Sequence, residues 1–249
     1  MSIIPPGLSR LLQFYLSGPL PCPYLPGRVE RKLFTRLTDK TETDTEINST
    51  LTRAGFRRSH DIVYRPACSE CNACVPVRIP VKAFAPSRSL KRVASINRDL
   101  TLEIAGTQIT DEQYELFAAY QTVRHPDSEM AHMTRAEFEQ MLHEGEADTH
   151  IYQLRTPKGE LIGGIIADHV SDGISAVYSF FSPDYQRRSL GVQLILTLID
   201  EMKRRDLPYV YLGYWIAAAR KMSYKARFQP LQALGPQGWD WLNLTEEMR

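Results

Sequence analysis

The spacing of apolar residues in the second half of the chain separates one long helix from a series of strands. Leu190, Leu194 and Leu198 recur at every fourth position, which places them on one helix face and predicts that element over 190–205. Shorter apolar runs on either side are bounded by turn-forming residues, such as the Pro-Lys-Gly at 157–159, and this pattern is typical of strands joined by hairpins. The predicted strands are 151–155, 161–170, 175–181 and 209–214, and a further helix is expected at 217–226.

The first half of the chain has a less regular pattern. Residues 1–26 are rich in proline and leucine, which favours extended chain and turns over a long helix. Strand-like runs at 28–37 and 63–80 flank a helix expected over 44–54, which Gly55 closes. Cap residues and amphipathic spacing predict three more helices, over 86–93, 111–120 and 134–142.

The order of these elements indicates a fold class. Two strands, a glycine-containing turn, a long helix, a strand and a helix follow one another as in the core of GNAT acyltransferases. We therefore expect an α+β fold with a GNAT-like core, a mixed sheet flanked by helices, in residues 106–249, and a cysteine-bearing, basic region in residues 1–105. The turn from Arg187 resembles the pyrophosphate-binding turn of coenzyme A-dependent members, with Gly191 in place. However, Gln193 stands where the last small residue belongs, which argues against coenzyme A.

Composition allows one large domain or two modest ones, since the chain has 249 residues and 43% of them are apolar. Its start lacks the basic stretch, apolar stretch and cleavage site of a secretory signal. No apolar run approaches the ~18–20 residues of a membrane span. The sequence is therefore interpreted as cytoplasmic, with no membrane partner.

The net charge of +1 conceals a strong segregation of charge. Residues 51–98 carry ten basic and two acidic side chains, whereas residues 99–160 carry four basic and thirteen acidic ones. One interpretation is a pair of solvated faces of opposite sign. The other is that the basic block, which also contains Phe56, Tyr64 and Phe84, binds a polyanion such as an RNA end.

Three cysteines at a spacing of three, Cys68, Cys71 and Cys74, are the most specific local motif, and Cys22 is the remaining cysteine. Thiols stay reduced in the cytosol, so the pattern favours a metal site over disulfides. A structural zinc ion or an iron–sulfur cluster needs four donors, and these four thiols supply them. The alternative is a chance cluster of small buried residues.

The segment after residue 208 is the second candidate for chemistry. As a regular strand it would place Tyr211, Gly213 and Trp215 on one face, ahead of a helix that carries Lys221, Tyr224 and Lys225. Tyrosine hydroxyls and lysine ammonium groups orient ester carbonyls or carboxylates. The competing interpretation is a core strand followed by a solvated helix. The six histidines are scattered, and none forms part of a nucleophile motif.

Several motifs together resemble one family. They are Cys-Pro-Tyr-Leu-Pro-Gly-Arg at 22–28, Gly-Phe-Arg-Arg-Ser at 55–59, Tyr-Arg-Pro at 64–66 with the cysteines, Pro-Val-Arg at 76–78, Pro-Ser-Arg-Ser at 86–89, the strand 211–216, and Lys-Met-x-Tyr-Lys at 221–225. In this combination the chain is similar to the bacterial aminoacyl-tRNA–protein transferases, the aspartate/glutamate leucyltransferases of the N-degron pathway. The resemblance covers residues 15–232. One departure is Ala218-Ala219-Arg220, where many relatives carry a small residue and a cysteine.

The resemblance implies a cytoplasmic aminoacyltransferase that takes leucine from leucyl-tRNA and joins it to proteins beginning with Asp or Glu, which marks them for degradation. No cofactor is required for that chemistry, and DNA is not expected as a partner. The rivals are an arginyl-tRNA donor, a coenzyme A-dependent GNAT acetyltransferase, and a non-enzymatic RNA-binding metal module.

The expected site residues follow from the basic and hydroxyl groups that this reaction uses. The acidic side chain of the acceptor is assigned to Arg78, or to Arg57 with Arg58. The acceptor end of the tRNA is assigned to Arg187, Arg188 and Lys221, with Lys225 as a further substrate-binding residue. Contacts with the ester are assigned to Tyr211, Tyr214 and Tyr224.

Overall fold

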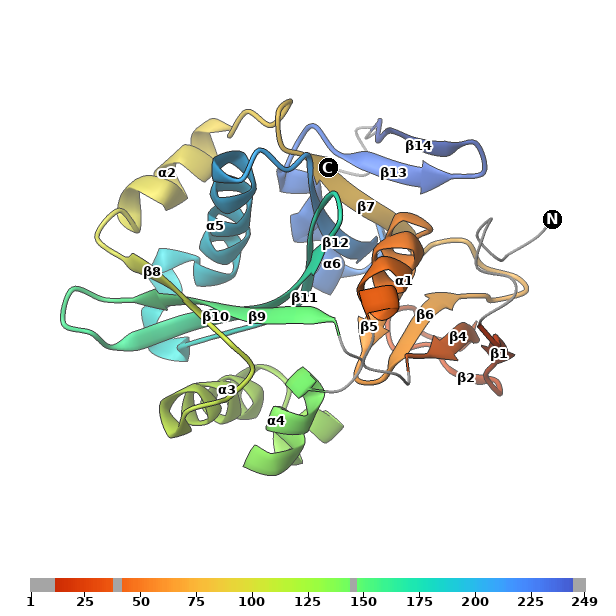
Figure 1. Ribbon diagram of the computed structural model, residues 1–249, viewed down its shortest axis with the longest axis horizontal. Coiled ribbons are helices and arrows are strands. Elements are labelled where there is room, and N and C mark those ends of the chain that lie inside the picture. The colour runs from red at the N-terminus through yellow and green to blue at the C-terminus, as the bar shows by residue number, and fades with distance from the viewer. Residues whose placement is uncertain (1–11, 38–41, 144–146, 244–249) are drawn as a thin grey trace.

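An eight-stranded mixed sheet forms the centre of the molecule (Figure 1). The computed structural model describes residues 12–37, 42–143 and 147–243. From one edge to the other the sheet contains β14 (Gly238–Trp241), β13 (Gln232–Gly235), β7 (Val75–Pro80), β12 (Tyr209–Trp215), β11 (Gly173–Phe181), β10 (Leu161–Val170), β9 (Asp148–Arg155) and β8 (Thr101–Ala105). The β11–β12 pair is parallel, and the other neighbouring pairs are antiparallel.

Helices cover both faces of this sheet (Figure 1). On one face lie α2 (Arg88–Ile96) and α5 (Leu190–Arg204), and the predicted helical periodicity of α5 buries Leu194 and Leu198 completely. On the other face lie α3 (Asp111–Arg124) and α4 (Arg135–His143), whose Phe117 and Phe138 rings stack 4.3 Å apart. Burying side chains of this size stabilises the fold by about 1.5–3 kcal/mol each.

The N-terminal segment forms a separate small sheet beside the main one (Figure 1). Its strand order is β1 (Tyr15–Leu16), β4 (Lys32–Arg36), β6 (Ile62–Pro66) and β5 (Arg57–Ser59), with β2 (Leu20–Pro21) paired to β3 (Val29–Glu30). Helix α1 (Glu42–Arg53) packs Leu51 against Phe56 and Val63. The boundary expected at residue 105 does not coincide with the separation between the sheets, because β7, α2 and β8 belong to the main sheet and its covering layer.

The structure confirms the expected mixed α+β class and most of the predicted elements, but it differs at three places. Strand β8 and the β13–β14 hairpin were not expected, since they are stabilised by pairing with other strands of the sheet. The helix expected at 217–226 is instead a short α6 (Arg220–Ser223) followed by the 3₁₀ turn η3 (Tyr224–Arg227). Two more 3₁₀ segments, η1 (Glu129–His132) and η2 (Pro183–Arg188), complete the described elements.

Strand β12 does not keep the regular alternation that its sequence suggests. Tyr211 lies opposite Arg78 and Tyr214 opposite Pro76, so β12 uses one residue more than β7 in this interval. Gly213 adopts a φ of +68°, a left-handed conformation that favours glycine, at this bulge. The expectation that Tyr211 and Trp215 share a face is therefore wrong, because the extra residue reverses the alternation.

Strands β11 and β12 pair over a short stretch. Their parallel ladder runs from Gly173 opposite Tyr209 to Ser175 opposite Tyr211, and no pairing between them continues beyond it. In the same region β11 has its own bulge, because Ile166 and Ala167 of β10 pair with Tyr178 and Ala176 and leave Val177 between them. We call the segments 176–181 and 212–215, which do not pair with each other, the β11–β12 divergence. It leaves backbone groups available to a side chain from elsewhere.

Candidate active site

Arg57 extends from β5 of the small sheet into the β11–β12 divergence. Its guanidinium donates a hydrogen bond to the carbonyl of the bulge residue Val177, which the ladder leaves unpaired. A side chain at Gly213 would overlap Arg57 Nη1, so the glycine is required both by its φ and by the close approach of the arginine. The two bulges therefore place one guanidinium between the diverging strands.

Tyr224 and Lys225 follow β12 and lie beside Arg57, but they differ in exposure. Tyr224 is 37% exposed, and its hydroxyl makes no hydrogen bond to the described residues. Burial of the hydroxyl end raises the pKa of Tyr224, and the nearby charge of Arg57 opposes that shift. Lys225 is only 3% exposed, and its Nζ donates to the Tyr214 carbonyl at 2.5 Å. Burial and, next, the charge of Arg57 lower the pKa of Lys225 well below its usual range.

A histidine and a second tyrosine extend this group toward α3. The ring of His125 meets the ring of Tyr120 edge-on, with centroids 5.8 Å apart. Burial lowers the pKa of His125, with further lowering by the positive charges of Lys221 and Arg124. Lys221 itself is exposed. The C-terminal end of α3 and the start of α6 thus meet near Tyr224. Neither Tyr120 nor His125 was expected here from the sequence, because no local motif distinguishes them.

Arg78 and Tyr211 belong to a different, enclosed network. Arg78 is 8% exposed, and its guanidinium carbon lies 3.5 Å from the ring centroid of Tyr209 and 4.4 Å from that of Trp239. It donates to Gln232 Oε1 at 2.8 Å and to the Tyr211 hydroxyl at 3.2 Å. That hydroxyl in turn donates to Asp172 Oδ2 at 2.9 Å. These contacts join β7, β12 and the β13–β14 hairpin, so this geometry suits a supporting role.

Arg58 and Tyr214 are also committed to internal contacts. Arg58 is 3% exposed and forms a two-point ion pair with Asp168, with Nε–Oδ2 at 2.7 Å and Nη2–Oδ1 at 2.8 Å. The Tyr214 hydroxyl lies 2.9 Å from the Gly55 carbonyl and 3.0 Å from the Tyr64 carbonyl. Of the residues assigned to substrate from sequence, Arg57, Tyr224 and Lys221 are the ones that the structure places near one another with access to solvent.

The turn before α5 has one free arginine and one that is paired. Arg188 forms a two-point ion pair with Asp99, at 2.8 and 2.9 Å, and donates to the Ile96 carbonyl at 3.2 Å. This pair joins η2 to the end of α2 and leaves Arg187 exposed beside it. We give the name α2 basic surface to the exposed basic side chains of α2 and of the two segments that meet at its C-terminal end. They are Arg88, Lys91, Arg92, Arg98 and Arg187.

The four cysteines gather at one pocket, although they come from separate segments of chain. Cys22, Cys68, Cys71 and Cys74 all line this pocket, and each is half-buried with a free thiol. Burial, together with the three neighbouring thiols, raises the pKa of Cys74 to about 11. The four thiols line one cavity, but no three of their sulfur atoms lie within 4.8 Å of one another, so a structural zinc ion or an iron–sulfur cluster on them stays a prediction from the sequence. Tyr214 also lines the pocket, so the pocket adjoins β12.

The sheet order, the bulged β11, the divergence from β12 and the helix α5 between them define a GNAT-like fold. Two solved structures share the fold. L-PGS of Bacillus licheniformis aligns with a TM-score of 0.52 at 11% identity, covering 89% of this chain and 82% of that one. The C-terminal domain of a putative lysylphosphatidylglycerol synthetase from Agrobacterium fabrum gives a TM-score of 0.50 at 15% identity, covering 78% and 62%.

Sequence comparison identifies the family within that class. Residues 20–92 match the family model described as arginine-tRNA-protein transferase, N terminus, and residues 112–235 match its C-terminus model. An aspartate/glutamate leucyltransferase of Paramagnetospirillum magneticum is 48% identical, covering 93% of this chain and 94% of the relative. One from Afipia carboxidovorans is 49% identical, covering 91% and 92%. The chain belongs to the aspartate/glutamate leucyltransferase family, which confirms the resemblance found in the sequence.

Proposed function

We propose that this protein transfers leucine from leucyl-tRNA to the N-terminal amine of proteins that begin with Asp or Glu. The relatives named above support the donor and the acceptors. The structural observation that carries the proposal is the position of Arg57, whose guanidinium lies in the β11–β12 divergence, near enough to Tyr224 for its charge to oppose the rise in pKa that burial causes at that hydroxyl. A cation that recognises a carboxylate and a hydroxyl that binds an ester oxygen are the two groups that this reaction needs at one place.

The reaction forms an amide and releases the ribose hydroxyl of the tRNA. The acceptor amine attacks the leucyl ester carbonyl, the tetrahedral oxyanion collapses, and the ester C–O bond breaks as the amine proton moves to the departing oxygen. Because the ester is already activated, positioning and oxyanion stabilisation account for the catalysis. In our proposal Arg57 binds the acidic side chain and Tyr224 donates to the oxyanion. A raised pKa keeps the Tyr224 hydroxyl protonated at neutral pH, as a donor must be.

His125 is proposed to take the proton from the acceptor amine. The acceptor α-ammonium must lose one proton before its nitrogen attacks, separate from the proton that later reaches the departing oxygen, and an imidazole serves as a base only in its neutral form. Burial and the charge of Lys221 favour that neutral form by lowering the pKa of His125. The residue therefore combines the required protonation state with a place beside Tyr120 at the edge of the site.

The α2 basic surface is proposed to bind phosphates near the acceptor end of the tRNA. Arg88, Lys91 and Arg92 are exposed on α2, and the Arg188–Asp99 pair holds Arg187 near the C-terminal end of that helix. Arg188 itself would not bind phosphate, because its guanidinium is already bound to Asp99. Its role would be to hold the turn that carries Arg187. Three assigned residues, Arg58, Arg78 and Lys225, are nearly buried, and we propose that they support the site without touching substrate.

Coenzyme A is disfavoured by the start of α5. Pyrophosphate binding at a helix N-terminus needs free backbone amides. Here the amides of Val192 and Gln193 donate to the Ser189 carbonyl, at 2.9 and 3.1 Å, as in the first turn of any α-helix, so the backbone does not discriminate between the two activities. What argues against an acetyltransferase is the presence of Gln193 where a small residue belongs.

We also propose that the cysteine pocket holds a structural metal. Cys22, Cys68, Cys71 and Cys74 would provide the four thiolates, and bound metal would fix the two cysteine segments against β12. No step of the transfer involves it. Metal-binding thiols must stay reduced, and the cytoplasm is a reducing compartment, so we propose a cytoplasmic location.

A panel of charged tRNAs and peptides tests the proposed function. Leucyl-, arginyl- and phenylalanyl-tRNA are each combined with peptides that differ only in a first residue of Asp, Glu, Lys or Ala, with acetyl-CoA as an additional donor. We expect transfer of leucine to the Asp and Glu peptides alone. Preferred transfer of arginine, or acetylation, would contradict the proposal.

A matched pair of tyrosine variants tests the role of Tyr224. Tyr224→Phe removes the proposed oxyanion donor and should lower kcat about 100-fold. Tyr114→Phe removes a hydroxyl that donates to the Met133 carbonyl at 3.0 Å, away from the site, and should leave kcat unchanged. Equal activities of the two variants would contradict the assignment of Tyr224.

A further inference from the structure

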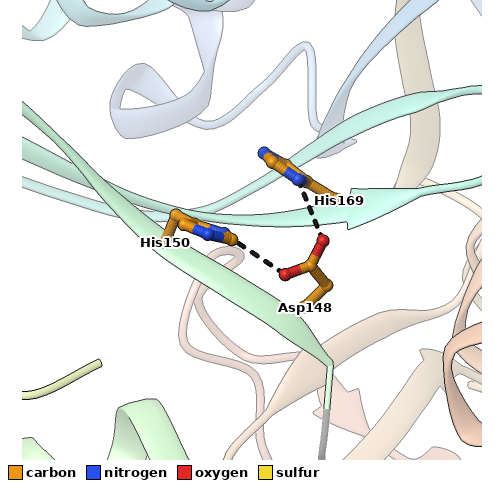
Figure 2. Close-up of side chains that lie close together, drawn as sticks. All are labelled: Asp148, His150 and His169. Atoms are coloured by element: carbon orange, nitrogen blue, oxygen red, sulfur yellow. Dashed lines mark hydrogen bonds and ion pairs between the residues drawn. The ribbon is translucent and has the colours of Figure 1, made fainter. Parts of the chain in front are cut away.

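Two histidines and an aspartate converge at one end of the β9–β10 pair, apart from the cysteine pocket (Figure 2). Asp148 begins β9, His150 follows on the same face, and His169 lies opposite Asp148 near the end of β10. Figure 2 shows the three side chains pointing toward one another, with the carboxylate close to both rings. Within residues 12–37, 42–143 and 147–243, this is the one set of three such side chains with ligand atoms within 4.8 Å of one another.

The distances between these side chains approach those of a coordination sphere. Asp148 Oδ2 lies 3.0 Å from His169 Nδ1, and Asp148 Oδ1 lies 3.4 Å from His150 Nδ1. Ligands about 2.1 Å from a tetrahedral metal ion lie about 3.4 Å apart. Both Nδ1 atoms are within 3.4 Å of the carboxylate, and the two imidazole rings are stacked, with centroids 4.6 Å apart and an angle of 17° between their planes. Because a ring nitrogen binds a metal in the plane of its ring, one ring has to rotate before all three donors bind one ion.

His150 has an unsatisfied nitrogen in this cluster. Its Nδ1 is buried and makes no hydrogen bond, despite the nearby Asp148 carboxylate. A buried polar atom without a partner is costly and unusual in folded proteins. A metal ion between His150, His169 and Asp148 would satisfy it.

His169 already has the second contact that a metal-binding histidine uses. Its Nε2 lies 2.7 Å from the Tyr152 hydroxyl, so Nδ1 is left for the carboxylate or for a metal. A partner on the far ring nitrogen fixes the orientation and tautomer of a ligating histidine. The nearby cation Arg205 is neutralised by Glu201, whose Oε1 lies 2.5 Å from Arg205 Nε.

We propose that Asp148, His150 and His169 form a second metal site, which binds a divalent ion of the zinc type through two imidazole nitrogens and a carboxylate. Two imidazoles and one carboxylate suit borderline ions such as Zn²⁺ and Co²⁺, and three protein ligands leave a position for water. Because Asp148 and His169 lie at the end of the β9–β10 pair, a bound ion ties the ends of these strands together. The site is structural and independent of the proposed transferase function.

Metal titration of the full-length reduced protein tests the proposal. Zn²⁺ stoichiometry is measured by calorimetry for the wild type, for His150→Gln and for His132→Gln, an exposed histidine outside the cluster. We expect His150→Gln to lose one zinc equivalent, or to bind it at least about tenfold more weakly, whereas His132→Gln matches the wild type. Because His150 makes no hydrogen bond through Nδ1, its replacement should leave the fold intact, which circular dichroism checks.

Co²⁺ spectra separate this site from the cysteines. Cobalt bound by imidazole and carboxylate gives visible d–d bands, whereas thiolate ligands add near-ultraviolet charge-transfer bands. We expect His150→Gln and Asp148→Asn each to lose one equivalent of bound cobalt. The spectrum should then lose part of its d–d bands while the thiolate charge-transfer bands stay unchanged. Unchanged zinc stoichiometry and affinity in both variants, or loss confined to the thiolate bands, would overturn the proposal.

Discussion

The Arg58–Asp168 pair provides the sharpest test of how the small sheet is joined to the main one. Arg58 lies in β5 and Asp168 in β10, and both side chains are 1% exposed. Thr149 Oγ1 donates to Asp168 Oδ1 at 2.8 Å, so the carboxylate is bonded from two directions. Asp168→Ala removes the carboxylate that binds two nitrogens of the buried Arg58 guanidinium.

The expected cost follows from the burial of the remaining charge. Removing one partner of a buried ion pair destabilises a protein by about 3–5 kcal/mol, because an unpaired charge stays in a low-dielectric interior. With a urea m-value of about 3 kcal/mol/M, this corresponds to a lower unfolding midpoint by about 1–1.7 M. Replacing both residues by apolar ones, as in Arg58→Met with Asp168→Leu, should cost less than Asp168→Ala alone.

An exposed pair in the same sheet provides the control. Arg36 and Asp61 lie 3.6 Å apart, with 65% and 38% of their side chains exposed. Water screens such a pair, so Asp61→Ala should cost less than about 1 kcal/mol. If Asp168→Ala shifted the urea midpoint no more than Asp61→Ala, the buried pair would not be the contact that joins the two sheets.

Three further predictions concern the proposed site and the tRNA surface. Arg57→Gln should lower kcat/KM for an Asp-starting peptide about 10–150-fold, the loss of one charged hydrogen bond, in protein that circular dichroism shows to be folded although it lacks the bond to Val177, and an unchanged kcat/KM would refute the role. Lys91→Gln with Arg92→Gln should weaken binding of all tRNAs alike and reduce the slope of log K against log salt by about 1.4–1.8, whereas a loss specific to leucyl-tRNA would argue against phosphate contacts. In NMR titration His125 should have a pKa below its ordinary 6.5, and Lys221→Gln should raise it. Since the folded pKa is the lower one, the stability linked to His125 is complete above pH 6.5 and is lost as the pH falls through the folded pKa, so the opposite slope would refute the assignment.

The sequence by itself determined the features that depend on neighbouring residues. The spacing of four residues between Leu190, Leu194 and Leu198 predicted α5, because residues four positions apart share one face of an α-helix. The alternating and apolar runs predicted β10 and β11 for similar reasons. The motifs between 22 and 225 identified the family, since their order along the chain is preserved whatever their arrangement in space.

Tertiary structure decided what each of these residues touches. Arg57 and Arg58 are adjacent and chemically identical in the sequence, yet one enters the β11–β12 divergence and the other a buried ion pair with Asp168. Successive strand residues point to opposite faces, and which face meets the core depends on strands far away in the chain. The bulge at Gly213 likewise reversed the alternation expected for β12, because β7 pairs with it there.

The histidine cluster shows the same division. Asp148, His150 and His169 form no recognisable motif, and the sequence analysis treated the histidines as scattered. They meet because the antiparallel register of β9 and β10 sets His169 opposite Asp148 and diagonal to His150. Local sequence determines which residues of a strand share a face. Only the register between strands determines which side chains of separate strands become neighbours.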